Sequence, residues 1–138
     1  MSEQIAVIYW SGTGNTQAMA EAVSNACGGT LYTPDAFPME QWAECGAVAL
    51  GCPAMGAEVL EESEFQPFFD AVKPLLSGKK LALFGSYGWG DGEWMRNWEE
   101  ECRAAGAAMV CDPVICQDAP DADALAQCEA LGRALKEA

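Results

Sequence analysis

Short apolar runs alternate along the chain with longer segments in which apolar residues recur at helical spacing. The short runs are rich in Val, Ile, Leu and Ala, which is typical of strands buried on both faces. They predict five strands, at residues 5–10, 31–33, 47–51, 80–84 and 109–115. The run at 31–33 is short, and we expect it at an edge of the sheet.

The intervening segments predict helices at residues 15–27, 40–45, 92–105 and 122–136, and a further helix that begins near "SEFQ" (63–66) and ends at Pro74. Gly28 and Gly29 close the first helix, Ser63 and Gln66 have the spacing of a capping box, and Asp121 is a candidate N-cap. The residues expected on buried helix faces are Met19, Val23, Phe65, Phe68, Phe69, Val72, Trp94, Met95, Trp98, Cys102, Leu125, Cys128, Leu131 and Leu135.

This alternation predicts a parallel sheet with helices on both faces, because parallel strands need crossover connections and these are right-handed. A length of 138 residues with 51% apolar composition fits one domain, residues 1–138. Sheets of this kind bind ligands beyond the carboxyl ends of their strands. The loops that follow the strands are therefore the candidate site.

Charge narrows the choice of partner. The chain has 21 acidic and 7 basic residues, a formal net charge of −14, and no Lys or Arg precedes Lys73. Nucleic acid and anionic membranes both require a basic face, so we expect neither as a partner. No apolar run is long enough to span a membrane and the N-terminus does not resemble a signal peptide, so we expect a cytoplasmic protein.

Histidine is absent, and the seven cysteines include no CxxC pair. The chain thus lacks the most common general base and metal ligand, and the cysteine spacing fits neither a disulfide framework nor a zinc or iron–sulfur site. We expect no metal, and cysteines that are reduced and mostly buried. Any redox or catalytic chemistry then belongs to a bound cofactor.

Three loops follow predicted strands: "SGTGNT" (11–16), "CPAMGAEVLEE" (52–62) and "GSYGWGDG" (85–92). The first combines two glycines, hydroxyl groups and the start of a helix, which favours a phosphate without a side-chain cation. It is no Walker loop, and Gln17 occupies the place of the third glycine of GxGxxG. The alternative is an ordinary turn with Thr13 or Asn15 as the N-cap.

The other two loops offer surfaces for an aromatic ligand. In the second, Met55 precedes Gly56 and either covers an apolar ring or folds back to fill a gap. In the third, Trp89 stands between two glycines and either provides a stacking surface or packs over its own loop. By contrast, Trp94 and Trp98 lie on a helical stripe and are expected in the core.

The segments "YWSGTGNT", "LGCPAMGAEVLEESEFQPFF" and "LFGSYGWGDGEWM" resemble the corresponding segments of flavodoxins, specifically the short-chain type of anaerobic bacteria. The resemblance covers essentially the whole chain, with three ordered motifs at matching spacing. It implies the flavodoxin-like fold, a three-layer α/β/α sandwich whose five-stranded parallel sheet has the order 2-1-3-4-5. It also implies one non-covalent FMN and an electron-transfer protein that is not an enzyme.

Position by position, the resemblance implies a set of FMN contacts. The phosphate would be wrapped by Ser11, Gly12, Thr13, Gly14, Asn15 and Thr16. The isoalloxazine would be sandwiched by Met55 and Trp89, with Glu58 at its pyrimidine edge and the amides of Gly88 and Gly90 at its carbonyls. Gly56 would carry the peptide whose carbonyl turns toward the ring nitrogen that is protonated in the semiquinone.

Two positions depart from the family pattern. Ala54 stands where some relatives have a hydroxyl that contacts the phosphate, so phosphate affinity would depend more on the first loop. Ala57 stands where relatives often have a polar residue, which affects the energetics of the peptide turn. Both residues nevertheless belong to the predicted cofactor-binding set.

Electrostatics adds a hypothesis about potential. An anionic hydroquinone beside Glu58, Glu61, Glu62 and Asp91 is disfavoured, which lowers the potential of that step. A carbonyl that accepts a hydrogen bond from the protonated ring nitrogen stabilises the semiquinone by about 1 kcal/mol. We therefore expect a low-potential one-electron carrier that shuttles between semiquinone and hydroquinone and can substitute for ferredoxin.

We expect a monomer that docks transiently, through its acidic rim, on basic surfaces of reductases or oxidoreductases. The alternative for the acidic run "LEESE" is a solvated start of a helix. An FMN-dependent quinone or nitro reductase on the same fold stays open, although it needs substrate room over the ring that short loops and Trp89 do not favour. A flavin-free receiver or phosphatase relative is not favoured. In this chain the third predicted strand does not end in a phosphoacceptor Asp, and no Cys stands at the head of the loop 11–16.

Overall fold

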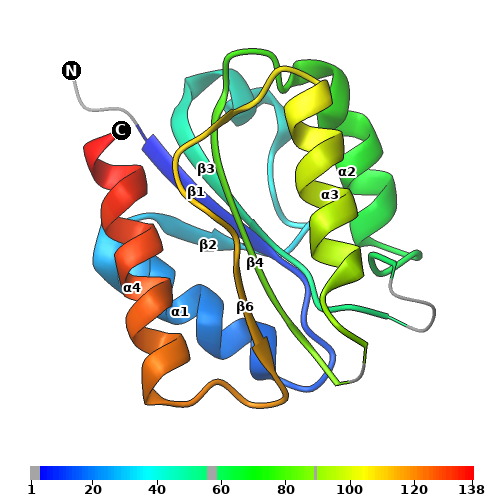
Figure 1. Ribbon diagram of the computed structural model, residues 1–138. Coiled ribbons are helices and arrows are strands. Elements are labelled where there is room, and N and C mark those ends of the chain that lie inside the picture. Colours follow the sequence, from blue (N-terminus) through cyan, green and yellow to red (C-terminus); the bar gives the residue numbers. More distant parts are fainter. Residues whose placement is uncertain (1–3, 56–58, 89) are drawn as a thin grey trace.

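A computed structural model describes residues 4–55, 59–88 and 90–138 of the chain. Its sheet lies between two layers of helices (Figure 1). The strands are β1 (Gln4–Tyr9), β2 (Thr30–Tyr32), β3 (Cys45–Gly51), β4 (Lys80–Tyr87), β5 (Ala108–Met109) and β6 (Val114–Gln117). They pair in parallel in the order β2-β1-β3-β4-β5, and β6 also pairs with β4. The predicted strand order and layered architecture are confirmed.

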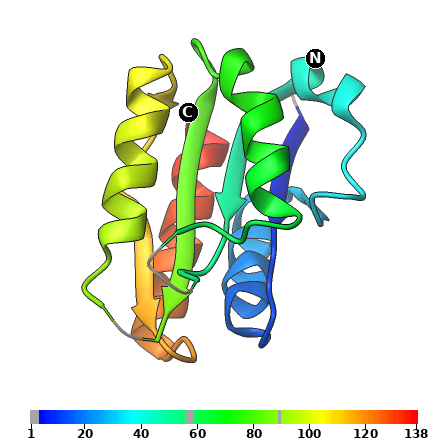
Figure 2. The same ribbon diagram turned by 90° about the vertical axis from the view of Figure 1, so that its right-hand side faces the viewer.

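Helices α1 (Asn15–Cys27) and α4 (Ala122–Glu137) cover one face of the sheet, and α2 (Phe65–Val72) and α3 (Glu93–Ala104) cover the other. Figure 2 shows the same layers from the side, with the loops that follow the strands gathered at one edge. Two 3₁₀ helices, η1 (Met39–Glu44) and η2 (Lys73–Leu75), complete the chain. Within the described ranges, none of the helices has the length and apolarity needed to cross a bilayer.

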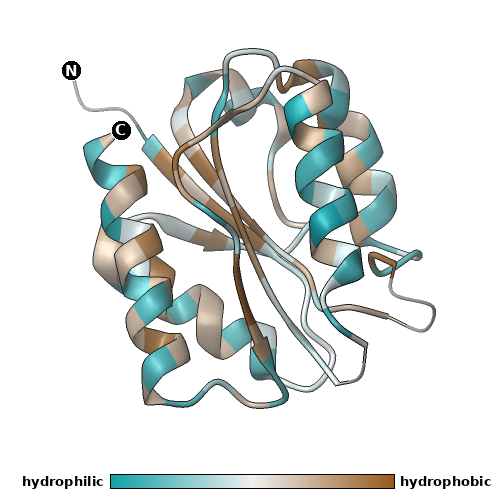
Figure 3. Cartoon of the chain, in the orientation of Figure 1, coloured by the Kyte–Doolittle hydropathy of each residue, from teal (hydrophilic) through white to brown (hydrophobic). Residues whose placement is uncertain are grey.

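Apolar side chains fill both faces of the sheet, which explains the continuous apolar runs in the sequence. Figure 3 colours the chain by hydropathy, with hydrophobic residues along β1 and β6. In β3, Val48 and Leu50 point to the side of α2 and α3, whereas Ala47 and Ala49 point to the side of α1 and α4. The two latter helices also pack closely on each other: a Cβ on Gly132 would lie 2.6 Å from the Val23 carbonyl oxygen. Gly132 therefore allows α1 and α4 to lie close together within their layer.

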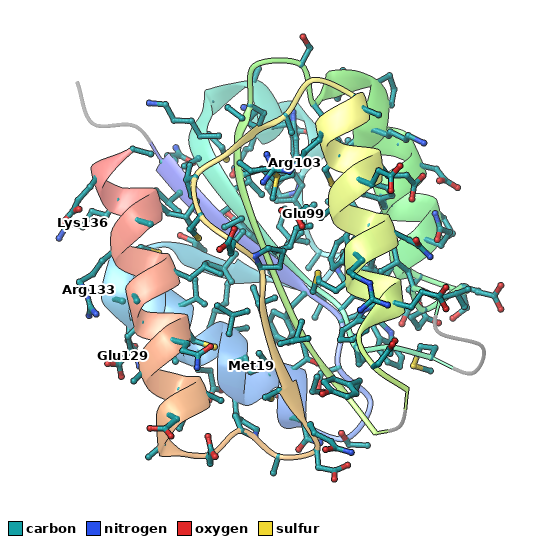
Figure 4. All side chains as sticks on the ribbon, in the orientation of Figure 1. Met19, Glu99, Arg103, Glu129, Arg133 and Lys136 are labelled. Atoms are coloured by element: carbon teal, nitrogen blue, oxygen red, sulfur yellow. The ribbon has the colours of Figure 1, made fainter. Side chains whose placement is uncertain are left out.

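The predicted buried helix faces are confirmed, except that Leu125 is only partly buried. Outside these faces, charged side chains project into solvent. Figure 4 shows Glu129, Arg133 and Lys136 on the outer side of α4, and α3 carries an ion pair between Glu99 and Arg103 with an N–O distance of 2.8 Å. This division of apolar and charged positions is the one expected of amphipathic helices.

The cysteines are reduced, as predicted. All seven lie in the described part of the chain, and none forms a disulfide. Five are buried, while Cys111 and Cys116 are partly exposed.

Two strand predictions need correction. The fifth strand is interrupted: β5 pairs with the start of β4 and β6 with its end, and residues 110–113 between them leave the ladder after the bond from the Val110 amide to the Leu81 carbonyl. Pro113 has no N–H to donate there. The strand predicted at 80–84 continues to Tyr87, so Gly85 and Ser86 belong to β4 and not to a loop.

The predicted helix ends are correct in two cases. Gly28 closes α1 in the left-handed conformation, with φ of 73°. Asp121 caps α4, and its carboxylate accepts a 2.8 Å hydrogen bond from the Ala124 amide. The helix expected at 40–45 is the 3₁₀ helix η1.

Candidate functional site

Backbone hydrogen bonds continue past the carboxyl ends of the strands and join the loops that follow them. The Trp10 amide donates to the Gly51 carbonyl at 3.0 Å, and the Ala54 amide donates to the Ser86 carbonyl at 3.0 Å. On the other side, the Asp118 amide donates to the Tyr87 carbonyl at 2.8 Å. The loops after β1, β3, β4 and β6 are thus held by backbone hydrogen bonds at the same edge of the sheet.

These four loops enclose an open cavity of about 250 Å³. It is lined by Trp10, Gly12, Thr13, Asn15, Pro53, Ala54, Met55, Ser86, Tyr87, Gly88 and Asp118. Six of these are among the predicted cofactor-binding residues, namely Gly12, Thr13, Asn15, Ala54, Met55 and Gly88. Met55 therefore faces the cavity instead of filling a gap in the core. No Lys or Arg is among the described residues that line it.

The other predicted site residues have different positions. Ser11 and Gly14 shape the first loop, because the Gly14 amide donates to the Ser11 Oγ at 3.0 Å. Thr16 is buried, and its hydroxyl lies 3.3 Å from that of Ser86, which links α1 to β4 beneath the cavity. Gly90 is exposed in the third loop. Four predicted residues lie outside the described part of the chain: Gly56, Ala57, Glu58 and Trp89.

The loop 11–16 leads into α1 without a side-chain cap. The N-cap of α1 is Gly14, with φ of 96°, and no side chain caps the helix. The alternative with Thr13 or Asn15 as the N-cap is therefore wrong. The amides of the first helical turn have no partner inside the helix, and no acidic residue lies in that turn. These N–H groups and the helix dipole favour a bound phosphate.

A buried carboxylate organises the second loop. Glu61 is 6% exposed, and its carboxylate accepts hydrogen bonds from the Ser63 hydroxyl and from the amides of Ser63, Glu64 and Phe65, at 2.7 to 2.9 Å for the amides. Burial raises the pKa of this carboxyl, but the hydrogen bonds outweigh it and lower the pKa from 4.5 to about 2. Glu61 is thus charged at neutral pH, and its carboxylate accepts hydrogen bonds from the amides at the start of α2.

The predicted capping box of Ser63 and Gln66 is consequently wrong. Residue Glu64 occupies the N-cap position without capping the helix, and the Gln66 side chain bonds Asp70 at 2.9 Å. The sequence pattern located the start of α2 correctly, but the acceptor of the amide hydrogen bonds there is Glu61 and not Ser63. A carboxylate further upstream accepts several amide bonds at once, which a hydroxyl does not.

Cys52 joins the second loop to the start of the third. Its carbonyl accepts a 3.1 Å hydrogen bond from the Trp94 Nε1, and its sulfur accepts one from the Glu61 amide at 3.3 Å. A Cβ on Gly85 would lie only 2.2 Å from the same carbonyl oxygen, so only glycine fits there. Burial raises the pKa of the Cys52 thiol to about 12, which keeps it protonated and unreactive.

Met55 and Val59 close the tip of the second loop. Each donates its amide to the carbonyl of the other, at 2.9 and 3.1 Å. The position of Met55 at the cavity is therefore fixed at its backbone. Together with the Glu61 contacts, these bonds hold both ends of the segment that leads from β3 to α2.

The sequence did not identify a fourth loop, which follows β6. Asp118 lines the cavity and has φ of 59°, a conformation that Asp and Asn tolerate better than other non-glycine residues. Gln117 donates its side-chain amide to the Gly88 carbonyl at 3.3 Å and so ties this loop to the third. The stretch "QDAPD" between strand and helix was the available signal.

The charges expected near the ligand are distributed unevenly. Asp91 pairs with Arg96 at 3.1 Å in an exposed contact, and the charge of Glu61 is surrounded by donors. By contrast, Glu62 and Asp118 form no ion pair with a residue in the described ranges. Among the described residues, the exposed negative charge near the cavity therefore comes partly from residues other than those the sequence suggested, Asp118 among them.

Fold and site together define a doubly wound α/β protein that binds a phosphorylated aromatic ligand at the carboxyl edge of its sheet. The family model described as "Flavodoxin" matches residues 7–132. The flavodoxin of Clostridium beijerinckii is 46% identical, over 83% of this chain and 87% of that protein. The flavodoxin of Megasphaera elsdenii is 41% identical, over 97% and 99%.

Solved structures agree. The two-electron reduced flavodoxin of Megasphaera elsdenii superimposes with a TM-score of 0.89 at 39% identity, covering 98% of this chain and all of that one. An archaeal flavodoxin superimposes with a TM-score of 0.85 at 27% identity, covering 97% and 96%. The chain belongs to the flavodoxin family. It is accordingly an FMN-binding electron-transfer protein and not an enzyme.

The described residues fit FMN. Unsatisfied amides at the start of α1 suit the phosphate, while Met55 and Tyr87 supply apolar surface for a ring system beside them. Gly12 packs closely on the Trp10 ring, since a Cβ at this position would lie 3.0 Å from it. When bound, FMN supplies the electron chemistry, and the chain supplies orientation and the local field.

We predict that Glu61→Gln destabilises the protein without its cofactor by about 1–3 kcal/mol at pH 7, because an amide has one acceptor oxygen and no charge. The folded pKa of about 2 lies below the unfolded value of 4.5, so the stabilisation is complete above about pH 5 and is lost as the pH falls toward 2. Urea unfolding at decreasing pH should show the difference from wild type shrinking. Glu62→Gln is the control, and a difference that does not depend on pH would contradict this role of Glu61.

Proposed function

We propose that this flavodoxin is a low-potential one-electron carrier that cycles between the semiquinone and hydroquinone of non-covalent FMN and can replace ferredoxin. The observation that carries the proposal is a cavity that combines uncapped helix amides with apolar surface and has no described Lys or Arg in its lining. Such a site binds the cofactor without a cation that would ease electron density onto it.

The proposed contacts follow the loops. Ser11 to Thr16 hold the phosphate, with Gly12 and Gly14 allowing close backbone approach. Met55 lies against one face of the ring, and the amides of Gly88 and Gly90 donate to its carbonyls. Roles for Gly56, Ala57, Glu58 and Trp89 are proposed on the family pattern, and Ala54 lies at the cavity wall without a hydroxyl.

Charge sets the direction of the potential. At an effective dielectric constant of about 20, one unit charge roughly 10 Å from the cofactor is worth about 1.7 kcal/mol, and 59 mV corresponds to a tenfold change in a one-electron equilibrium. Glu62, Glu64 and Asp118 lie in loops that enclose the site. Each disfavours the added electron, so the second reduction step has a low potential.

The same acidic rim supports a proposal about partners and place. Exposed carboxylates beside the cavity favour transient docking on basic patches of reductases or oxidoreductases, with no membrane or nucleic acid involved. We propose that the protein works as a monomer in the cytoplasm. Transient, electrostatically steered docking suits a carrier that must leave one partner and find the next.

The proposal predicts that the FMN-loaded protein shows a blue semiquinone during stepwise reduction with dithionite. The hydrogen bond to the protonated ring nitrogen separates the two reduction steps, and the acidic surroundings lower the second. Visible spectroscopy at controlled potential measures both steps. Direct passage to the hydroquinone would refute one-electron cycling, and rapid turnover with NAD(P)H alone would favour a reductase instead.

We predict that Thr13→Lys raises the semiquinone/hydroquinone potential by tens of millivolts. Thr13 is exposed and lines the cavity, so an added cation there stabilises the charge gained in the second step. Thr13→Gln is the control, since it adds similar length without charge. Equal potentials in the two variants would mean that the lack of cations in the phosphate loop has no effect on the potential.

We predict that Glu62→Lys slows electron transfer to a basic c-type cytochrome by roughly 3- to 10-fold at low ionic strength. Glu129→Lys changes the net charge equally on the outer side of α4 and should leave the rate near that of wild type (Figure 4). Stopped-flow mixing at low and high salt measures the rates. Equal slowing by both substitutions would show an effect of net charge and not of a docking surface.

A further inference from the structure

A single side-chain hydrogen bond joins the phosphate loop to the loop that carries Met55. The Trp10 Nε1 donates to the Glu64 Oε1 at 2.7 Å, across a sequence separation of 54 residues. Among the hydrogen bonds between described side chains, this one directly connects the segment before Ser11 with the segment between β3 and α2. The acceptor is a carboxylate, and the bond lies at the exposed surface of the protein.

Each end of this bond is itself fixed. The Trp10 ring packs beneath the phosphate loop, since a Cβ on Gly12 would lie 3.0 Å from its Cη2 and 3.3 Å from its Cζ3. The Glu64 amide donates to the buried Glu61 carboxylate at 2.7 Å, and the Glu61 amide donates to the Cys52 sulfur. A movement of the phosphate loop is therefore transmitted through Trp10 to the second loop.

We propose that Glu64 is a positioning residue that couples phosphate binding to the geometry of the ring-binding loop. With the phosphate bound, the first loop holds the Trp10 indole, and the indole holds Glu64 and the loop behind it. The phosphate then contributes to affinity twice, through its own contacts and through the ordering of the second loop. This inference rests on the proposed phosphate site at Ser11–Thr16.

The test compares the affinities of the cofactor-free protein for FMN and for riboflavin, which lacks the phosphate. The quantity measured is the ratio of the riboflavin dissociation constant to the FMN dissociation constant. A substitution that only weakens the fold raises both constants together and leaves the ratio unchanged. Loss of coupling lowers the ratio, because only FMN uses the connection.

Glu64→Gln and Glu64→Ala form the decisive pair, since both remove the charge but only the glutamine retains an acceptor. We expect the ratio for Glu64→Ala to be about fivefold lower than for Glu64→Gln, the equivalent of one hydrogen bond. Removing a negative charge near a phosphate dianion acts in the opposite direction, so charge alone does not produce this result. Glu62→Ala, an exposed neighbour with no hydrogen bond to a described side chain, should keep the wild-type ratio or raise it.

The Trp10→Phe background supplies the second arm, because phenylalanine has no N–H to donate. In that background the ratios for Glu64→Gln and Glu64→Ala should become equal. Equal ratios already in the wild-type background would overturn the proposal, as would a difference that persists with Phe at position 10. If wild type itself shows no preference for FMN over riboflavin, the phosphate site fails and not only the coupling.

Discussion

Every part of the site depends on where the parallel ladder stops. The chain leaves the sheet at four neighbouring strand ends, and each exit must satisfy backbone groups that the ladder no longer pairs. The bonds from Trp10, Cys52, Ala54 and Asp118 to the adjoining strand ends meet this requirement. The cavity residues therefore start from a rigid edge, although the loops themselves contain little regular structure.

Basic side chains and the cavity lie mostly at opposite edges of the sheet. Basic residues lie mainly at the opposite edge, where Lys79 donates to the Trp42 and Cys45 carbonyls at 2.8 and 2.7 Å. Arg103 and Lys136 occupy the last turns of helices that run back from the cavity, where a cation is favourable to the helix dipole. The amino end of α1 lies at the cavity, so its backbone dipoles supply positive potential there. A site without basic side chains can in this way accept a ligand phosphate.

The sequence predicted the layers and most element limits because these depend on local pattern, whereas the strand order was predicted from the resemblance to flavodoxins. Continuous apolar runs, apolar residues at helical spacing, a terminal glycine such as Gly28 and a cap such as Asp121 each involve only a few neighbouring residues. The wrong strand limits arose where residues distant in the sequence determine whether a segment pairs with the sheet. Pro113 lies in the interruption of a ladder whose partner is β4. Gly85 looks like a loop residue but pairs with β6, and it is glycine because the Cys52 carbonyl approaches it.

Prediction of the candidate site from the sequence was limited for the same reason. Its glycine-rich loops were visible as motifs, but Asp118, which also lines the cavity, lies outside all three of them. Glu61 is the clearest case, because an acidic run normally indicates solvent and this member of it is buried. The folded chain removes one charge of the run from the rim and uses it to cap α2. Glu64 accepts a hydrogen bond from Trp10, and Glu62 has no hydrogen bond to a described side chain. The three neighbouring acidic residues 61, 62 and 64 therefore have different surroundings, although the sequence presents them as one acidic run.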